Sequence, residues 1–186
     1  MDNQSAQTTR WIRVWDPLVR LFHWSLVLSF AAAWLSANSW ESLHIWAGYA
    51  AGGLIALRIV WGLIGSPYAR FSQFLRSPRT TVAYLKSIAA GGEIRYVGHN
   101  PAGGAMIVAL MVAMATTAFT GWMLTTDALW GVKWAQHLHN YSADGLLLLI
   151  ILHLAGVALA SYRHRENLIR GMLLGTKRAA GPSDVG

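Results

Sequence analysis

Four long apolar segments, separated by polar stretches, dominate the pattern of the 186-residue chain. Each is close to the roughly 20 residues that an α-helix needs to cross about 30 Å of hydrocarbon. No repeat is present at the spacings typical of solenoid or propeller proteins. The pattern therefore predicts an all-α integral membrane protein, a four-helix bundle in a single domain over residues 1–186, with spans at residues 19–37, 43–64, 103–124 and 141–161.

Two further segments are amphipathic and basic. Residues 82–88 place apolar side chains on either side of Lys86, and residues 162–178 mix leucines with arginines. Both are expected to form short helices at the membrane surface, attracted by anionic lipid. A solvated charged helix is the alternative for each. Residues 179–186, which contain glycine, proline and serine, are expected to form a flexible tail.

Composition supports a membrane protein. Hydrophobic residues make up 54% of the chain and charged residues 12%, whereas a soluble domain carries about 25% charged residues. The chain has no cysteine. Disulfides, cysteine-held iron–sulfur clusters and covalently attached c-type haem are therefore excluded, and any cofactor must be held by other side chains.

The positive charge is distributed unevenly along the chain. The formal net charge is +7, and all but two of the lysines and arginines lie within residues 10–20, 70–95 and 163–178. Because basic loops stay on the cytoplasmic side, both termini and the connection over residues 65–100 are expected in the cytoplasm, with the two short connections outside. Membrane topology explains the basic character, so we expect no nucleic-acid partner.

The first apolar segment has a second interpretation. Its end, AAAWLSA, resembles the cleavage region of a secretory signal peptide. However, the segment over residues 19–37 is longer than the apolar core of such a peptide, and it contains His23. We therefore interpret it as a retained membrane span.

Four of the seven histidines lie within or beside the apolar segments. His23 and His153 fall inside spans, whereas His44 and His139 fall at span ends. An ionisable side chain in hydrocarbon is a functional candidate, because its burial is costly without a partner. A hydrogen bond between helices is the simpler explanation for a single histidine, but four on three helices indicate a common type of ligand.

The spacing of the histidines predicts two pairs at two depths. His139 and His153 are 14 residues apart, hence about 21 Å apart along a helix and within about 40° of the same face. The alternating helix directions place His44 level with His139 near the outer surface, and His23 level with His153 towards the cytoplasm. His137 projects about 160° away from His153, which favours His139 as the partner of His44.

Haem suits each pair better than a single metal ion. A zinc ion bound by one pair would have only two protein ligands, which is poor for zinc. A haem takes two axial imidazoles on opposite faces, and opposing helices supply them without a covalent bond. The spacing thus predicts two non-covalent haem b groups, with His23–His153 and His44–His139 as the pairs of iron ligands.

Small residues stand near the predicted ligands. Gly48 and Gly52 follow His44, and Gly145 and Gly156 lie near the histidines of the last span. Glycines of this kind also serve close helix packing, which is the alternative interpretation. Because these glycines lie near the histidines, room for a porphyrin is the better interpretation.

Two arginines lie at the predicted inner level. Arg58 stands 14 residues after His44, and Arg20 precedes His23 by three residues. Both are candidates for binding haem propionates, and snorkelling to lipid headgroups is the alternative for Arg58. Asp144 has several possible roles, as a helix cap or kink, as a partner of an aromatic side chain, or in a proton route.

The chain carries several motifs at these positions. RVWDPLVRLFHW contains the first span histidine, HIWAGYAAGGLIALRIVWGLIGSPYARF contains the second and the span arginine, and GHNPAGG precedes the third span. Together with the His139–His153 spacing, they resemble the prokaryotic cytochrome b561 family, which includes the cytochrome b subunits of nickel–iron hydrogenases. The similarity covers residues 12–165 and implies four helices with two b haems bound by the four histidines. Asn140 is a departure, because the family often has an acidic residue there.

The resemblance also implies a function in the respiratory chain of the bacterial cytoplasmic (inner) membrane. Electrons would pass between membrane quinone and a periplasmic cytochrome c, dehydrogenase or hydrogenase. From their position, Trp130, Lys133 and Trp134 are candidate outer contacts, although an interfacial aromatic belt is the favoured explanation of the two tryptophans. One alternative is a superoxide oxidase that reduces quinone without a protein partner. Another is a haem-free transporter or proton channel that uses the histidines as relays. No catalytic residue is assigned.

Overall fold

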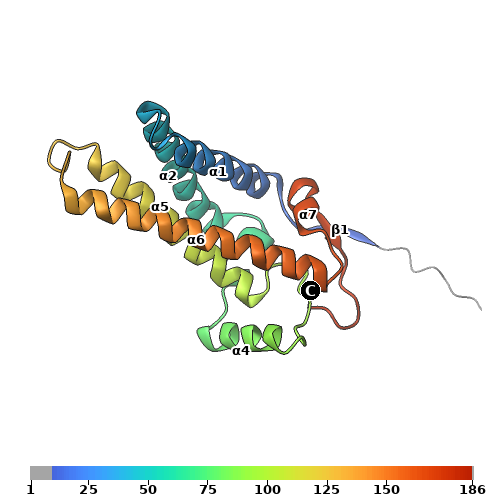
Figure 1. The fold of residues 1–186 in the computed structure, drawn as a ribbon. Helices are drawn as coiled ribbons and strands as arrows, with labels where there is room; N and C mark the ends of the chain where they lie inside the picture. The colour runs from blue at the N-terminus through green and yellow to red at the C-terminus, as the bar shows by residue number, and fades with distance from the viewer. Residues whose placement is uncertain (1–9, 186) are drawn as a thin grey trace, which may run out of the picture.

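The structure, a computed structural model, describes residues 10–185. Four long helices form most of the molecule, and short elements connect them and cover one end (Figure 1). The elements in chain order are β1 (Trp11–Arg13), α1 (Pro17–Ser36), α2 (Glu41–Ile64), the 3₁₀ helix η1 (Pro67–Ala69), α3 (Phe71–Phe74), α4 (Pro78–Ala89), α5 (Pro101–Leu124), α6 (Lys133–Arg163), α7 (Leu168–Leu174) and β2 (Thr176–Arg178).

The four long helices coincide with the four predicted spans. α1, α2, α5 and α6 are each long and apolar enough to cross a membrane. α1 packs on α2, α5 packs on α6, and α2 also contacts α5 (Figure 1). α6 begins at Lys133 rather than at residue 141, because the residues before 141 are polar but still helical. His137 and His139 therefore lie inside this helix and not before it.

Capping side chains define where two of the helices begin. The Asp16 carboxylate accepts a hydrogen bond from the Val19 N–H at 2.8 Å at the start of α1. Asn100 Oδ1 accepts from the Gly103 N–H at 2.7 Å at the start of α5. A proline follows each cap, and its fixed φ suits the first turn of a helix. Short polar side chains thus set both boundaries locally.

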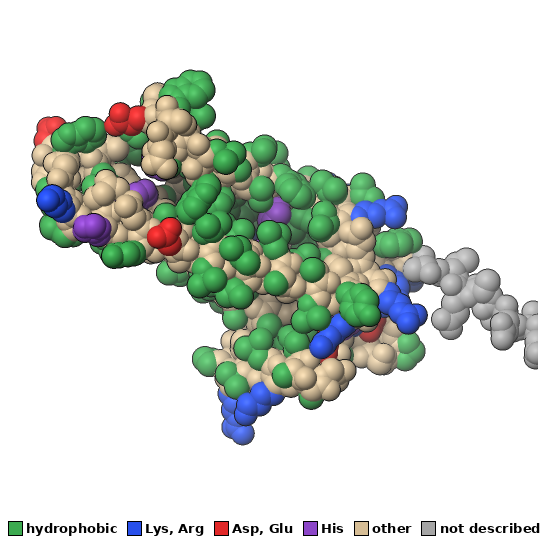
Figure 2. Space-filling view, in the orientation of Figure 1, with side chains coloured by type: hydrophobic (Ala, Val, Ile, Leu, Met, Phe, Trp, Pro, Cys, Tyr) green, Lys and Arg blue, Asp and Glu red, His purple; other side chains and the backbone are tan. Residues whose placement is uncertain are grey.

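The two ends of the bundle differ in what they carry. The α1–α2 and α5–α6 connections lie at one end, here termed the loop end, and α4, α7 and the paired strands β1 and β2 lie at the other, termed the terminal end (Figure 1). Lysine and arginine side chains gather mainly at the terminal end (Figure 2). Between the ends the surface is apolar, and Leu28 and Leu35 are 70% and 79% exposed. A broad apolar surface around long helices is typical of contact with lipid.

Distant parts of the chain pair at the terminal end. β1 and β2 form an antiparallel two-stranded sheet in which Ile12 lies opposite Lys177. The segment over residues 162–178 therefore forms the end of α6, then α7 and β2, instead of one amphipathic helix. The other amphipathic segment, residues 82–88, lies within α4 as predicted, with Tyr84 buried and Leu85 exposed.

The C-terminal segment makes specific contacts, although its composition is typical of a flexible tail. The Ala179 N–H donates to the Arg10 carbonyl at 2.8 Å. Asp184 forms an ion pair with the buried Arg95 at 2.5 Å, and Arg95 also pairs with Glu166 at 2.9 Å. This cluster joins the loop before α5, the turn after α6 and the end of the chain.

Candidate functional site

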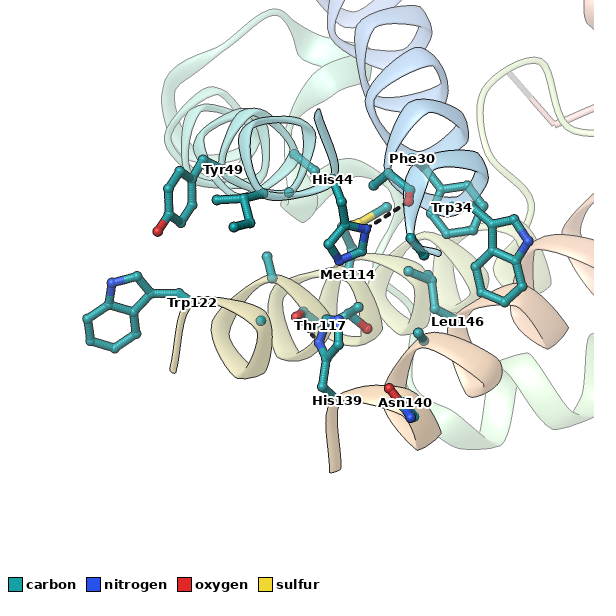
Figure 3. A pocket seen from close by; sticks show the side chains of 18 of the residues that line it. Phe30, Trp34, His44, Tyr49, Met114, Thr117, Trp122, His139, Asn140 and Leu146 are labelled. Atoms are coloured by element: carbon teal, nitrogen blue, oxygen red, sulfur yellow. Dashed lines mark hydrogen bonds between the residues drawn. The ribbon is translucent and has the colours of Figure 1, made fainter. Parts of the chain in front are cut away.

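Two histidines face each other near the loop end of the bundle. His44 projects from α2 and His139 from α6, and the centroids of their rings are 6.0 Å apart with the ring planes at 84° (Figure 3). Both side chains are half-buried. The structure thus brings together the pair that the spacing predicts. His137 instead is exposed and stacks on Tyr141, at 6.2 Å between ring centroids.

The Nδ1 atoms of this pair are both held by backbone carbonyls. His44 Nδ1 lies 2.8 Å from the Ala33 carbonyl oxygen of α1, and His139 Nδ1 lies 3.1 Å from the Thr117 carbonyl oxygen of α5. A carbonyl oxygen only accepts hydrogen bonds, so in the neutral ring each Nδ1 carries the hydrogen and each Nε2 keeps its lone pair. This arrangement is typical of histidines that bind a metal through Nε2.

A cavity of about 540 Å³ surrounds the two rings and is lined by all four long helices. Gly48 lines it, and a Cβ atom at Gly48 would have no heavy atom within 4 Å. Gly121 lies against the His139 ring, because a Cβ atom added at Gly121 would be 3.0 Å from Cε1 of His139. Gly52, by contrast, approaches Ala118 of α5 and serves helix packing. Gly48 is therefore the predicted glycine that leaves open space beside a histidine in this cavity.

Polar side chains line the same cavity towards the loop end. Asn140 accepts a hydrogen bond from Gln136 Nε2 at 2.9 Å, and both residues line the cavity. Asp144 lines it one turn further along α6. Of the roles considered for Asp144, a cap is ruled out by its position in the middle of α6.

The second predicted pair lies towards the terminal end. His23 on α1 and His153 on α6 are both half-buried. His23 Nδ1 is buried and has no hydrogen-bond partner among residues 10–185. An unpaired buried polar atom is costly, so this nitrogen suits a hydrogen-bonding partner from a bound cofactor or a water molecule.

Arg58 and Arg20 both carry unused buried donors at this end. Arg58 is 5% exposed, and its Nη2 donates to the Ala69 carbonyl at 2.9 Å while its guanidinium lies 5.2 Å from the Phe71 ring centroid. Arg20 Nη1 donates to the Leu173 carbonyl at 2.5 Å. Arg58 Nη1 and Arg20 Nε are buried without a partner in the described part of the chain. The burial of Arg58 is inconsistent with snorkelling, and both groups suit an anionic oxygen acceptor.

Sequence patterns assigned no role to three further features, one at the loop end and two towards the terminal end. The Thr120 hydroxyl lies 3.2 Å from His139 Nδ1, beside the Thr117 carbonyl. His99 lies between Trp15 and Phe74, at ring-centroid distances of 4.5 and 4.7 Å. Burial, with the nearby charges of Lys177 and Arg58, lowers the pKa of His99 to about 3. The Trp24 indole N–H is also buried without a partner in the described part of the chain.

The loop-end site suits a metal held inside a planar chelate. The ring centroids of His44 and His139 are 6.0 Å apart, and a metal ion with imidazole nitrogen ligands at about 2.0 Å would fit between rings at that separation. Within residues 10–185 no group of three or more histidine or acidic side chains is placed to hold a metal ion. A metal between His44 and His139 therefore needs further ligands from a cofactor such as a porphyrin.

Comparison with protein families decides the assignment. The family described as prokaryotic cytochrome b561 matches residues 14–175. The chain belongs to the prokaryotic cytochrome b561 family. Among curated proteins and solved structures, no match was found. Membership in this family, with four apolar helices, makes the chain a multi-pass bacterial membrane protein of a group that carries haem b and transfers electrons.

Proposed function

We propose that this protein is a di-haem b-type cytochrome that transfers electrons between a periplasmic redox partner and the membrane quinone pool. Haem iron supplies one-electron redox chemistry when it is bound. His44 and His139 would hold one haem at the loop end, and His23 and His153 would hold the second at the terminal end. The observation that carries the proposal is the opposed His44–His139 pair, with both Nδ1 atoms on carbonyls, an arrangement that leaves the Nε2 lone pair of each neutral ring for a metal.

The continuity of α6 supports the pairing of two sites at two levels. α6 runs without interruption from Lys133 to Arg163 and contains both His139 and His153. A straight helix holds these residues about 21 Å apart along its axis and on nearly one face. The edges of two macrocycles are much closer than their centres, so one rigid helix sets a fixed separation for electron transfer between them.

Further residues of the chain would bind and orient the cofactors. The unused donors of Arg58 and Arg20 suit the propionates of the haem at the terminal end. The open space beside Gly48 suits a porphyrin edge at the loop end. The apolar walls of the bundle lower the local dielectric, which is one of the means by which a protein sets a haem potential.

Charge distribution supports an orientation in the membrane. Basic side chains concentrate at the terminal end (Figure 2), and basic segments stay in the cytoplasm. The loop end then faces the periplasm of a bacterial inner membrane. Trp130 and Trp134 are 67% and 57% exposed there, beside Lys133, and these residues are the candidate contacts of a cytochrome c or dehydrogenase.

Removal of single ligands tests the proposal. His139→Ala and His153→Ala should each lower the haem content from two per chain to one, as measured by pyridine haemochrome, and each should leave a different spectral component. His137→Ala is the matched control, because this exposed residue of the same helix should retain two haems. If both ligand variants kept two haems per chain, the assignment would be wrong.

A second measurement separates the electron-transfer roles. Purified protein is mixed with a quinone analogue and either reduced cytochrome c or superoxide. Electron transfer that requires a protein donor supports the proposal, whereas rapid quinone reduction by superoxide alone would make the protein a superoxide oxidase.

A further inference from the structure

A layer of apolar side chains closes the inner end of the loop-end cavity. Ala51, Met114 and Leu146 line the cavity and are 3%, 6% and 1% exposed. Phe30 of α1 also lines it and packs against this buried cluster. Phe30, Met114 and Leu146 border the pocket from α1, α5 and α6 (Figure 3). We name these four residues, one from each long helix, the septum.

The septum lies midway between the two histidine levels. Leu146 is seven residues from His139 and seven from His153 along α6. Ala51 stands at the same interval from His44 and from the buried arginine of α2. At about 1.5 Å per residue, the septum is roughly 10 Å from either level. Two helices with matching intervals thus place a buried apolar side chain at the same depth.

Polar groups lie on both sides of this layer. Thr117 and Asn140 line the cavity on the loop-end side. Arg20 and Arg58 place unpartnered buried donors on the terminal side, within the described part of the chain. Water enters cavities that offer it polar partners, and it stays out of apolar ones. The septum, together with the neighbouring buried Ile55, therefore separates the polar lining of the loop-end cavity from the buried donors on the terminal side.

We propose that the septum is a barrier to water and protons, so that electrons cross the bundle without a proton leak. Proton movement needs a continuous chain of hydrogen-bonding groups, and none of the four septum side chains donates a hydrogen bond. Electrons need no such chain. A charge-conducting path through the bundle would dissipate the potential across the membrane. The inference rests on the proposed transfer of electrons through the bundle, and its structural basis is the cavity and the buried layer.

Polar substitution in the septum tests this proposal. Met114→Gln keeps the length of the side chain and adds an amide, and Leu146→Asn adds an amide of similar size on α6. Leu148→Asn is the matched control, because Leu148 is on the same helix but is 57% exposed on the outer surface. Each purified protein, with its bound pigment, is reconstituted in liposomes that contain a pH-sensitive dye, and proton entry is followed after an imposed pH step.

The expected result is a several-fold faster proton entry with Met114→Gln and Leu146→Asn than with the unaltered protein. The unaltered protein and Leu148→Asn should match liposomes without protein. The proposal is overturned if the unaltered protein already conducts protons. It is also overturned if Met114→Gln, with an unchanged absorbance spectrum and helix content, admits protons no faster than Leu148→Asn. The leak assay involves no redox reaction, so a failure of the proposed electron-transfer role is detected separately.

Discussion

The rings of His44 and His139 face each other across one cavity, 6.0 Å apart between centroids, while a different helix holds the Nδ1 atom of each. Ala33 of α1 holds His44, and Thr117 of α5 holds His139. All four long helices therefore contribute to one pair of ligands. Because the rings are already oriented, a cofactor that enters loses little free energy to ordering the side chains.

Filling the open space beside Gly48 should exclude the loop-end cofactor. A Cβ at this position meets no protein atom within 4 Å, so Gly48→Leu should fold normally but occupy the volume that a porphyrin edge needs. We expect haem content to fall from two per chain to one, with the remaining spectrum that of the His23–His153 site. Gly53→Leu is the control, because Gly53 is exposed on the same helix and also meets nothing within 4 Å. If Gly48→Leu retained two haems, the macrocycle would not occupy the space beside Gly48.

Removal of the Arg58 charge should lower one haem potential and leave the other unchanged. A buried positive charge stabilises the reduced form of a nearby haem, because reduction adds an electron. We expect Arg58→Met to lower the midpoint potential of the terminal-end haem by about 50–100 mV, as measured by a spectroscopic redox titration. Arg58→Lys should stay near the original value, since it keeps the charge. Equal shifts of both potentials would indicate a general structural change and not a local contact.

The positions of the membrane helices were predictable because they follow from local composition. An apolar run directly indicates contact with lipid. The 14-residue interval between His139 and His153 determines how far apart in depth the two histidines lie and that they share nearly one face of the helix. The start of α6 was not predictable in this way. Residues 133–140 include lysine, glutamine and asparagine, and an apolar-run criterion detects contact with lipid, not helicity itself.

Features that depend on contacts between distant segments were not predictable. The pairing of β1 with β2 joins residues near opposite ends of the chain, and neither three-residue strand is strong enough in sequence to be recognised alone. The carbonyl partners of His44 and His139 belong to neighbouring helices, and a carbonyl has no signature in the sequence. Only the rotation and depth of α1 and α5 against α2 and α6 determine these contacts.

The buried ion cluster around Arg95 should hold the terminal segments in place. Arg95→Met leaves the carboxylates of Glu166 and Asp184 without their main partner, and such a loss from a buried pair costs about 3–5 kcal/mol. We expect faster amide hydrogen exchange in β2 and at Val185, whose N–H donates to the Arg95 carbonyl, with both haems retained. Arg163→Met is the control, because the Arg163 side chain is 31% exposed in its pair with Glu93, and partly exposed pairs contribute about 1 kcal/mol or less. Equal rates of amide hydrogen exchange in the two variants would show that the Arg95 cluster does not hold the terminal segments in place.

Replacement of His99 should reduce the acid sensitivity of the fold. Burial, then the charges of Lys177 and Arg58, lowers the pKa of His99 to about 3 in the folded state, against 6.5 as its ordinary value. Between these values the unfolded chain binds the extra proton, so the free energy of unfolding falls as the pH falls below 6.5, by up to about 1.4 kcal/mol per pH unit. His99→Phe, with an apolar ring between Trp15 and Phe74, should therefore show a smaller fall in melting temperature between pH 7 and pH 5. The lowered pKa values of Glu166 and Asp184 lie below 4.5 and 3.8, which is outside the interval from pH 5 to pH 7 over which the melting temperatures are compared. The exposed-site variant His137→Phe should keep the original pH dependence, and an unchanged dependence in His99→Phe would show that His99 is protonated in the folded protein.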